Sequence, residues 1–290
     1  SAVSGTGLAG TAVLYVHGYN DYFFQRELAD FFADRGAAFY ALDLRKYGRS
    51  LRAHHTPNWC RQLGDYDAEL DAAAEVVLGS GAERLLLVGH STGGLTLPLW
   101  AARRPHLPVG GLILNSPFFT FRQPAAVRLA LLPATSVLAR RDPLRPLPGG
   151  LSGMYGASLH ASRHGEWDYD TRWKPIGGLP IRAGWVAAIA EGHRTLAAGL
   201  DLAAPALVLT STRTVATRRW TSELQRGDSV LDADAIARRS PALGRHVTSV
   251  RVENAMHDVW LSPLAVRQAA YDVTARWLDA WVSTPGRAHP

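Results

Sequence analysis

The stretch Leu-Leu-Leu-Val-Gly-His-Ser-Thr-Gly-Gly occupies residues 85–94 of a chain of 290 residues. Its four leading apolar residues predict a buried strand, and the apolar-rich segment that follows predicts a helix. Between them lies Gly89-x-Ser91-x-Gly93, a pattern that forms a sharp turn in a strand–turn–helix context. Glycines two positions either side of the serine remove Cβ atoms that would collide in so tight a turn. We therefore expect the Ser91 hydroxyl at a helix N-terminus, where backbone N–H groups favour developing negative charge, and not a glycine–serine turn without chemistry.

The composition is that of a globular protein. Hydrophobic residues make up 47% and charged residues 19% of the chain, which has room for one large core, alone or with an inserted subdomain. No apolar run approaches the ~20 residues of a membrane-spanning helix, so we expect no stable membrane insertion. No charged–apolar–small leader opens the chain, and the single cysteine, Cys60, rules out an internal disulfide. We therefore expect a cytoplasmic protein.

The formal net charge of +6 raises the question of a nucleic-acid partner. All but two of the 31 basic residues are arginines, and they are scattered as single residues and pairs without a dense basic run. Alanine and arginine richness together are more typical of genome composition than of a phosphate-binding face. We expect no nucleic-acid partner.

Short apolar runs that favour β-structure recur along the chain, and several are separated by segments with helical periodicity. The expected strands are Ala12–Val16, Phe39–Leu42, Leu85–Val88, Leu112–Leu114, Ala206–Thr210 and Thr248–Val252. The expected helices between them include Phe23–Arg35 and Tyr66–Leu78. Strands that alternate with helices predict an α/β protein, with a mostly parallel central sheet covered by helices on both faces.

The alternation breaks between Phe118 and Leu202. This region contains a stretch dense in proline, glycine and arginine, an aromatic cluster, and a helix-like run at Trp185–Leu200. We interpret residues 118–202 as an inserted helical lid on a core formed by residues 1–117 and 203–290. Open α/β sheets bind substrates at the carboxyl edge, where such a lid would sit. A long excursion packed away from the site is the alternative.

A serine becomes a nucleophile when a base takes its proton, and that base needs an orienting acid. In folds with this turn the chain order is serine, acid, histidine, each at the carboxyl end of a strand. His257 is the expected base, because it follows the last expected strand in a short polar loop. The expected acid is Asp228, which ends the long loop after Ala206–Thr210. Asp232 stays the alternative acid, although an aspartate at a helix start often only caps the helix.

An oxyanion needs two N–H donors aimed at the place where its charge develops. Thr92 directly follows the serine and is expected to supply one of them. The loop His17-Gly18-Tyr19-Asn20, after the first expected strand, is expected to supply the other from Tyr19, with Gly18 permitting close approach. We interpret His17 as a residue that braces this loop and not as a base.

Aromatic and histidine side chains near these loops are candidates for the wall of a substrate pocket. They are His17, Tyr22, Phe23, His90, Trp167 and Trp185. A helix is expected to begin at Asp21, directly after the loop formed by residues 17–20. The sequence offers no support for a metal, because His54 and His55 are adjacent and no spacing of Cys, His and Asp matches a ligand set. No dinucleotide motif follows a strand, so we expect no cofactor.

Five motifs carry a family resemblance. They are His17-Gly18-Tyr19-Asn20, Asp43–Ser50, Gly89–Gly94, Asp228–Asp232 and Met256-His257-Asp258. With them the chain resembles an α/β-hydrolase, and more narrowly the monoacylglycerol lipase/lysophospholipase group, also labelled serine aminopeptidase S33. The resemblance implies the α/β-hydrolase fold and assigns the following roles: Ser91 as nucleophile, Asp228 as acid, His257 as base, Tyr19 and Thr92 as oxyanion donors. The sequence departs from the family pattern at Lys46, at Pro98 and in the long loop before Asp228.

These expectations combine into a serine hydrolase that cleaves carboxylic esters through an acyl-enzyme intermediate. The aromatic residues of the expected lid favour a small-molecule ester with a sizeable apolar part. Acyl transfer, lactone opening and C–C bond hydrolysis would use the same three residues. A non-catalytic ligand-binding protein is the alternative of a different class.

Overall fold

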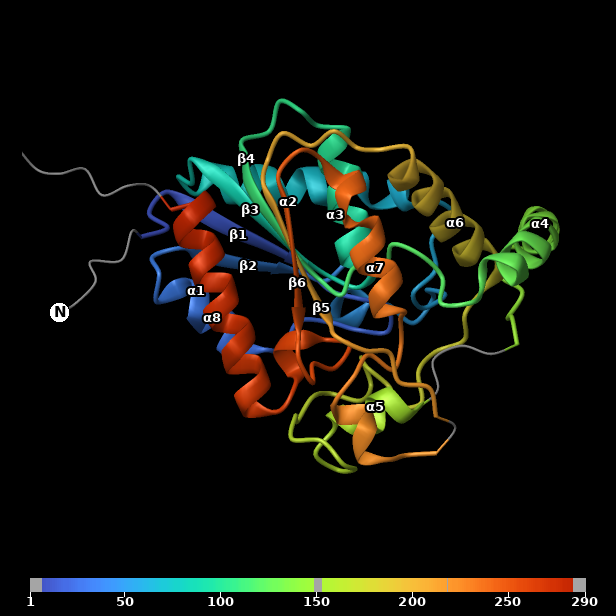
Figure 1. The fold of residues 1–290 in the computed structure, drawn as a ribbon. Coiled ribbons are helices and arrows are strands. Elements are labelled where there is room, and N and C mark those ends of the chain that lie inside the picture. Colours follow the sequence, from blue (N-terminus) through green and yellow to red (C-terminus); the bar gives the residue numbers. More distant parts are fainter. Residues whose placement is uncertain (1–6, 149–152, 218, 284–290) are drawn as a thin grey trace, which may run out of the picture.

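The structure is a computed structural model that describes residues 7–148, 153–217 and 219–283. Its centre is a six-stranded sheet in the order β2-β1-β3-β4-β5-β6, with every neighbouring pair parallel (Figure 1). The strands are β1 (Thr11–Val16), β2 (Ala38–Leu42), β3 (Arg84–His90), β4 (Val109–Asn115), β5 (Ala206–Ser211) and β6 (Val247–Val252). The predicted parallel sheet is confirmed. Residues 1–6, 149–152, 218 and 284–290, which the expected core and lid include, lie outside the described residues.

Helices cover both faces of the sheet. The helices α1 (Arg26–Ala33) and α8 (Leu264–Trp281) lie together on one face (Figure 1). The other face is covered by α2 (Asp67–Gly79), α3 (Thr92–Ala102), α6 (Ala183–Ala197) and α7 (Ala233–Arg239). Each layer forms its own hydrophobic cluster with the sheet, as expected for a doubly covered α/β fold.

The strand β3 contains four consecutive apolar residues, Leu85–Val88, because both of its faces are covered. Leu85 and Leu87 pack in the cluster that contains α2 and α3, whereas Leu86 and Val88 pack in the cluster that contains α1 and α8. Successive side chains of a strand point to opposite faces, and here both faces are covered. A continuous apolar run therefore identifies this strand better than an alternating pattern would.

The turn after β3 is fixed by close backbone approaches. Ser91 has φ 50° and ψ −111°, a conformation that residues other than glycine rarely adopt. A Cβ on Gly93 would lie 2.3 Å from the carbonyl oxygen of Val16, and one on Gly89 would lie 2.8 Å from the backbone of Gly93. The Ser91 N–H donates to the carbonyl oxygen of Asn115 over 3.0 Å. The turn is thus wedged between β1 and β4, the two neighbours of β3 in the sheet.

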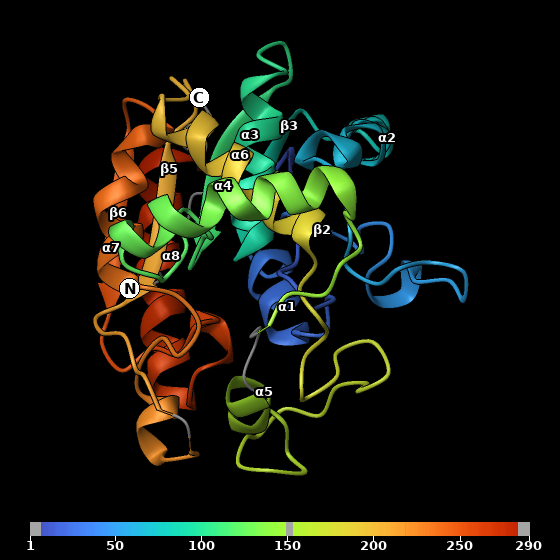
Figure 2. The same ribbon diagram turned by 90° about the vertical axis from the view of Figure 1, so that its right-hand side faces the viewer.

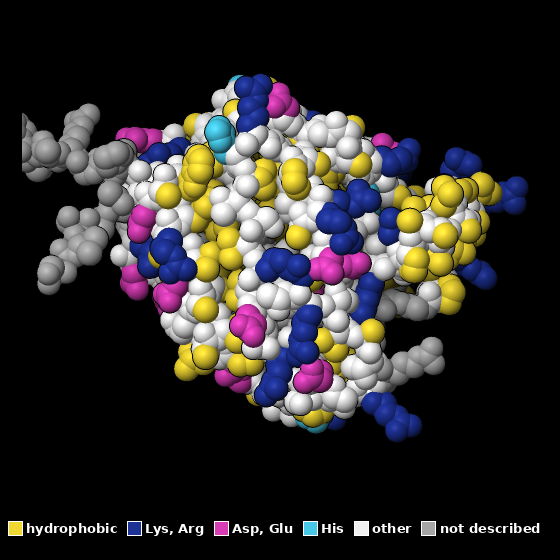
Figure 3. Space-filling model, in the orientation of Figure 1, with side chains coloured by type: hydrophobic (Ala, Val, Ile, Leu, Met, Phe, Trp, Pro, Cys, Tyr) yellow, Lys and Arg dark blue, Asp and Glu magenta, His cyan; other side chains and the backbone are white. Residues whose placement is uncertain are grey.

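Residues 118–202 contain α4 (Ala125–Arg141), α5 (Gly153–Leu159) and α6. The helix α6 packs against α3 and α4, and α4 crosses in front of α6 (Figure 2). The sequence pattern did not predict α4, whose interior holds Pro133. Among its exposed side chains, Leu129 and Leu131 contribute to an apolar surface (Figure 3). In the part of the chain that the structure describes, no helix is long and apolar enough to cross a membrane.

The prediction that a helix begins at Asp21 is wrong, because α1 begins at Arg26. Tertiary contacts hold the preceding residues outside the helix. The Asp21 carboxylate is paired with Lys174, and the Tyr22 hydroxyl accepts a hydrogen bond from the Asp170 N–H over 2.7 Å. These long-range contacts override the local helical pattern.

We predict that Gly93→Ala lowers the midpoint of thermal unfolding by about 5–10 °C or prevents folding. Its new Cβ would overlap the Val16 carbonyl oxygen, and no flexible side chain there can move aside. Gly79→Ala is the matched control, because nothing lies within 4 Å of a Cβ at that position. Equal unfolding midpoints for the two variants would contradict this explanation of the turn.

Candidate active site

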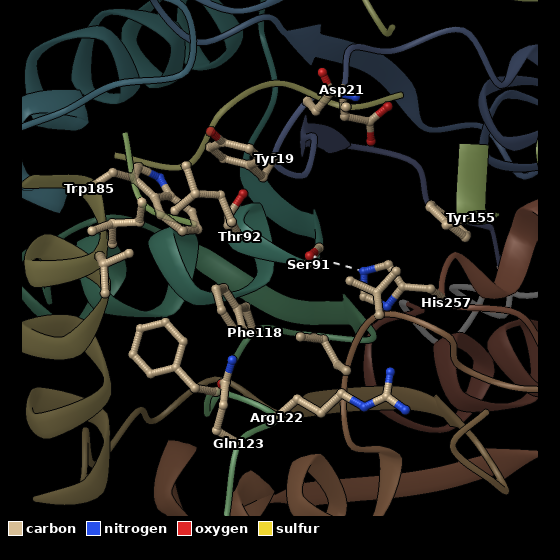
Figure 4. Close-up of a pocket in the computed structure, with 18 of the residues that line it drawn as sticks. Tyr19, Asp21, Ser91, Thr92, Phe118, Arg122, Gln123, Tyr155, Trp185 and His257 are labelled. Carbon is tan, nitrogen blue, oxygen red and sulfur yellow. Dashed lines mark hydrogen bonds between the residues drawn. The ribbon is translucent and has the colours of Figure 1, made fainter. Parts of the chain in front are cut away.

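Ser91, His257 and Asp228 lie in hydrogen-bonding contact at the carboxyl edge of the sheet. Ser91 Oγ lies 3.1 Å from His257 Nε2 (Figure 4), and His257 Nδ1 lies 2.9 Å from Asp228 Oδ2. The three residues come from the turn after β3, the loop after β6 and the loop after β5. All three are buried, with 7%, 3% and 0% exposed. Such an arrangement can withdraw a proton from the serine hydroxyl.

The two aspartates considered as the acid have different surroundings. Burial raises the pKa of Asp228, but His257 and two backbone N–H groups of the following turn lower it, and the net pKa lies below its usual value. Asp232 instead caps α7, where its Oδ1 accepts from the Ala235 N–H over 2.9 Å. The structure therefore brings Asp228, and not Asp232, to His257.

The loop that carries His257 is held by the next residue, Asp258. The buried Asp258 carboxylate accepts from Asn115 Nδ2 over 2.6 Å and from Gln25 Nε2 over 3.1 Å. Asn115 Oδ1 in turn accepts from a backbone N–H of the same loop over 3.0 Å. Neither Asn115 nor Gln25 was expected at the site from the sequence. The signal for Asn115 was its place at the end of β4, where a polar residue follows an apolar run.

The two expected oxyanion donors, Tyr19 and Thr92, line the same cavity as Ser91. Thr92 is the first residue of α3, so its N–H has no acceptor within the helix. A Cβ on Gly18 would lie 3.1 Å from the Cβ of Ser91, so glycine lets the Tyr19 loop lie directly against the turn. The backbone segments that carry both amides are therefore adjacent to the serine.

A cavity of about 330 Å³ opens over Ser91. Figure 4 shows Phe118 and Trp185 on one side of the serine, and Tyr155 beside His257 on the other. Further apolar side chains in the lining are Val127, Leu131, Leu132, Ile181 and Val186. Further polar side chains in the lining include Asn20, Asp21, Tyr169 and Lys174. Over the described ranges, no group of three His, Cys, Asp or Glu residues is placed to hold a metal ion.

Of the six residues expected in the pocket wall, His90 and Trp185 line this cavity. Contrary to expectation, the lining does not include His17, Tyr22, Phe23 and Trp167. The imidazole of His17 bridges two loop backbones, and the indole N–H of Trp167 donates to a backbone carbonyl over 2.9 Å. The ring of Phe23 packs against an aromatic ring of β1. Residue type alone did not distinguish side chains of the wall from side chains of the core.

His193 of α6 supports the apolar side of the cavity from behind. Its ring packs edge-on against those of Phe118 and Phe121, and its Nε2 donates to the carbonyl oxygen of Phe118 over 2.7 Å. The Phe118 N–H donates to the carbonyl oxygen of Ser91 over 2.9 Å. Burial lowers the pKa of His193 to about 4. A neutral histidine therefore links α6 to the turn that carries the serine.

Comparisons with known proteins agree with this architecture. The family model described as serine aminopeptidase, S33, matches residues 9–213. The monoacylglycerol lipase of Paleococcus ferrophilus is similar in structure, with a TM-score of 0.68 and 20% identity over 93% of this chain and 94% of that one. A soluble variant of monoglyceride lipase from Saccharomyces cerevisiae, in complex with a substrate analog, has a TM-score of 0.67 and 16% identity over 95% and 88% of the two chains.

A third solved structure, Est1E from Butyrivibrio proteoclasticus with bound ferulic acid, has a TM-score of 0.57 and 13% identity. The similarity covers 96% of this chain and 91% of that one. At these identities the likeness shows a shared fold. No curated protein matches the sequence.

We predict that Asp228→Asn lowers kcat for an activated ester about 1,000–10,000-fold, because an amide no longer holds the imidazole in the tautomer that accepts the serine proton. Asp232→Asn is the matched control. Asparagine also caps a helix, so this variant should keep kcat within about two-fold. Steady-state kinetics of the two variants decide between the two acids, and the reverse ranking would assign the role to Asp232.

We predict that His193 makes stability depend on pH between about 6.5 and 4. The pKa of the folded residue lies below that of the unfolded one, so its contribution is fully present above pH 6.5 and is lost as the pH falls. A shift of this size corresponds to roughly 3 kcal/mol. Urea unfolding at pH 7 and pH 4.5 should show a smaller loss for His193→Gln than for the wild type.

The control for this measurement is His246→Gln, which removes an exposed histidine. It should keep the pH dependence of the wild type. If His193→Gln lost as much stability on acidification as the wild type does, another group would be responsible.

Proposed function

Because the chain belongs to the serine aminopeptidase S33 family of α/β-hydrolases, we propose that it hydrolyses carboxylic esters through an acyl-enzyme intermediate. The observation that carries this proposal is the 3.1 Å contact between Ser91 Oγ and His257 Nε2 in the wall of a largely apolar cavity. The 2.9 Å contact between His257 and Asp228 completes a nucleophile, base and acid in one line.

In the proposed reaction, His257 Nε2 takes the Ser91 proton as Oγ attacks the ester carbonyl carbon. Nε2 then gives that proton to the leaving alcohol as the C–O bond breaks, and the acyl group stays on Ser91. A water molecule, deprotonated by His257 Nε2, then attacks the acyl carbon. The bond between that carbon and Ser91 Oγ breaks, Nε2 returns the proton to Oγ, and the carboxylic acid is released. Asp228 accepts from Nδ1–H throughout, which keeps Nε2 free to accept a proton.

The tetrahedral intermediate carries its negative charge on the former carbonyl oxygen. We assign the N–H groups of Tyr19 and Thr92 as its donors. The start of α3 adds the favourable field of a helix N-terminus at the same place. Removing one such donor typically costs about 100–1,000-fold in kcat.

The lining of the cavity supports a small-molecule ester with an apolar acyl part. Phe118 and Trp185 would face that part, while Tyr155 stands beside His257, which must deliver a proton to the leaving group (Figure 4). The two similar lipases are named for monoacylglycerol and monoglyceride, which supports an ester as substrate. The reaction requires no cofactor.

The remaining expectations extend this proposal. Residues 118–202 contribute Tyr155, Lys174 and Trp185 to the cavity lining, which supports their role as a lid. We propose no nucleic-acid partner and no stable insertion into a membrane. A cytoplasmic location stays a prediction from the single cysteine.

We predict that Ser91→Ala lowers ester turnover by about 10,000-fold or more, because it removes the hydroxyl that His257 is proposed to deprotonate. Ser116→Ala is the matched control. Ser116 is buried at the same sheet edge, and in the described part of the chain its hydroxyl has no hydrogen-bond partner. The rate at which each variant hydrolyses a p-nitrophenyl ester gives its turnover. Wild-type turnover by Ser91→Ala would refute the proposal.

Product analysis of the wild type in the presence of a competing alcohol identifies the acceptor. Hydrolysis releases the free acid as the main product. If a transesterified product predominated instead, the proposed reaction would be acyl transfer and not hydrolysis. Acyl transfer would use the same three residues.

A further inference from the structure

Four consecutive residues after β1 are each bonded to one distant segment of the chain. The Tyr19 hydroxyl donates to the Pro180 carbonyl oxygen over 2.9 Å, and Asn20 Nδ2 donates to the Pro175 carbonyl oxygen over 3.0 Å. Lys174 Nζ lies 2.5 Å from Asp21 Oδ1, and the Asp170 N–H donates to the Tyr22 hydroxyl over 2.7 Å. We call residues 170–180 the strap and residues 17–22 the Tyr19 loop.

The strap reaches the backbone of the Tyr19 loop through one carboxylate. Asp21 Oδ2 accepts from the Gly18 N–H over 3.3 Å, while Oδ1 accepts from Lys174. Asn20 lies between Gly18 and Asp21 in the chain. It has φ 54°, in the left-handed region that asparagine tolerates better than most residues. Figure 4 shows Tyr19 and Asp21 on the same side of the cavity. The Lys174–Asp21 pair therefore holds both flanks of the Tyr19 peptide group.

The pair is buried, with Asp21 1% and Lys174 5% exposed. Burial raises the pKa of Asp21, but Lys174 lowers it, and the net pKa lies below its usual value, so the Asp21 carboxylate is charged at neutral pH. The free-energy cost of removing two charges from water offsets much of the attraction between them. A buried ion pair therefore contributes little net stability compared with apolar residues of the same size. What such a pair does supply is a defined geometry.

Lys174 is already committed to a carboxylate. It also lies over the rings of Phe24 and Tyr169, 5.5 and 5.6 Å from their centroids. An ammonium group with these partners is better suited to fixing the loop than to binding an anionic substrate, although it borders the cavity.

We propose that Lys174 and Asp21 are positioning residues, through which the strap fixes the Tyr19 N–H for the developing oxyanion. The inference rests on the proposed function, because it concerns the transition state of that reaction. A loop that is only displaced keeps part of its donor strength, so the expected loss is smaller than that for a deleted donor. We expect kcat to fall about 10–100-fold when the pair is removed, with KM unchanged within about two-fold.

The chain offers a matched set of variants, because Lys46 and Lys174 are its only lysines. Lys174→Met removes the ammonium group and keeps the length of the side chain. Asp21→Asn combined with Lys174→Met removes both charges, so no unpaired carboxylate is buried if the single variant fails to fold. Lys174→Arg restores the charge and should recover kcat to within a few-fold. Lys46→Met is the control, since Lys46 lies over the ring of Trp59 and outside the cavity over Ser91.

The experiment measures kcat and KM on a p-nitrophenyl ester, together with inhibition by a trifluoromethyl ketone. The ketone forms a hemiketal oxyanion on the serine, so its affinity should fall in parallel with kcat. Hydrogen exchange of the peptide that covers residues 17–22 should become faster in Lys174→Met and in the double variant, but not in Lys46→Met. A purely structural role would change the unfolding midpoint without this split between kcat and KM.

Two results would overturn the inference. One is a folded double variant with wild-type kcat and wild-type exchange in the Tyr19 loop. The other is a raised KM with unchanged kcat, which would make Lys174 a substrate-binding residue. Failure of the proposed function is distinguishable from both, because the wild type itself would then show no turnover that depends on Ser91.

Discussion

The close approach of Gly93 to the Val16 carbonyl oxygen is the constraint on which the site depends. Only a residue without a Cβ fits there, and the fit lets α3 start directly against the end of β1. Ser91 then has to reverse the chain within one residue, which accounts for its φ of 50°. The same contact brings the Tyr19 loop, which continues from β1, against the serine. The strain at Ser91 and the proximity of the proposed oxyanion donors therefore have a common origin.

Asn115 joins the two halves of the candidate active site. Its carbonyl oxygen accepts from the Ser91 N–H, and its side chain bonds to Asp258 and to the backbone of the loop that carries His257. Ser91 and His257 are 166 positions apart in the chain, yet both are fixed to the last residue of β4. Their 3.1 Å separation thus follows from a shared support.

The sequence predicted the parts of this structure that rest on local rules. The turn at Ser91 was found because a tight turn needs glycine, and the central strands were found because a strand that is covered on both faces is mainly apolar. The helix α1 was expected, but its start was placed too early. Asp21 and Tyr22 bond to residues 153 and 148 positions away, and no local pattern records such contacts. Asp228 was correctly expected next to His257, but Asp232 stayed open as the alternative, because an acid and a helix cap use the same residue type.

The rate at which a fluorophosphonate modifies the protein tests the central claim most directly, with the modified residue identified by peptide mass spectrometry. The account predicts a single adduct on Ser91 in the wild type. Replacement of His257 by alanine should slow its formation at least about 1,000-fold, while the protein stays folded. An adduct on another residue, or an equal rate without the imidazole, would contradict the claim that His257 activates Ser91.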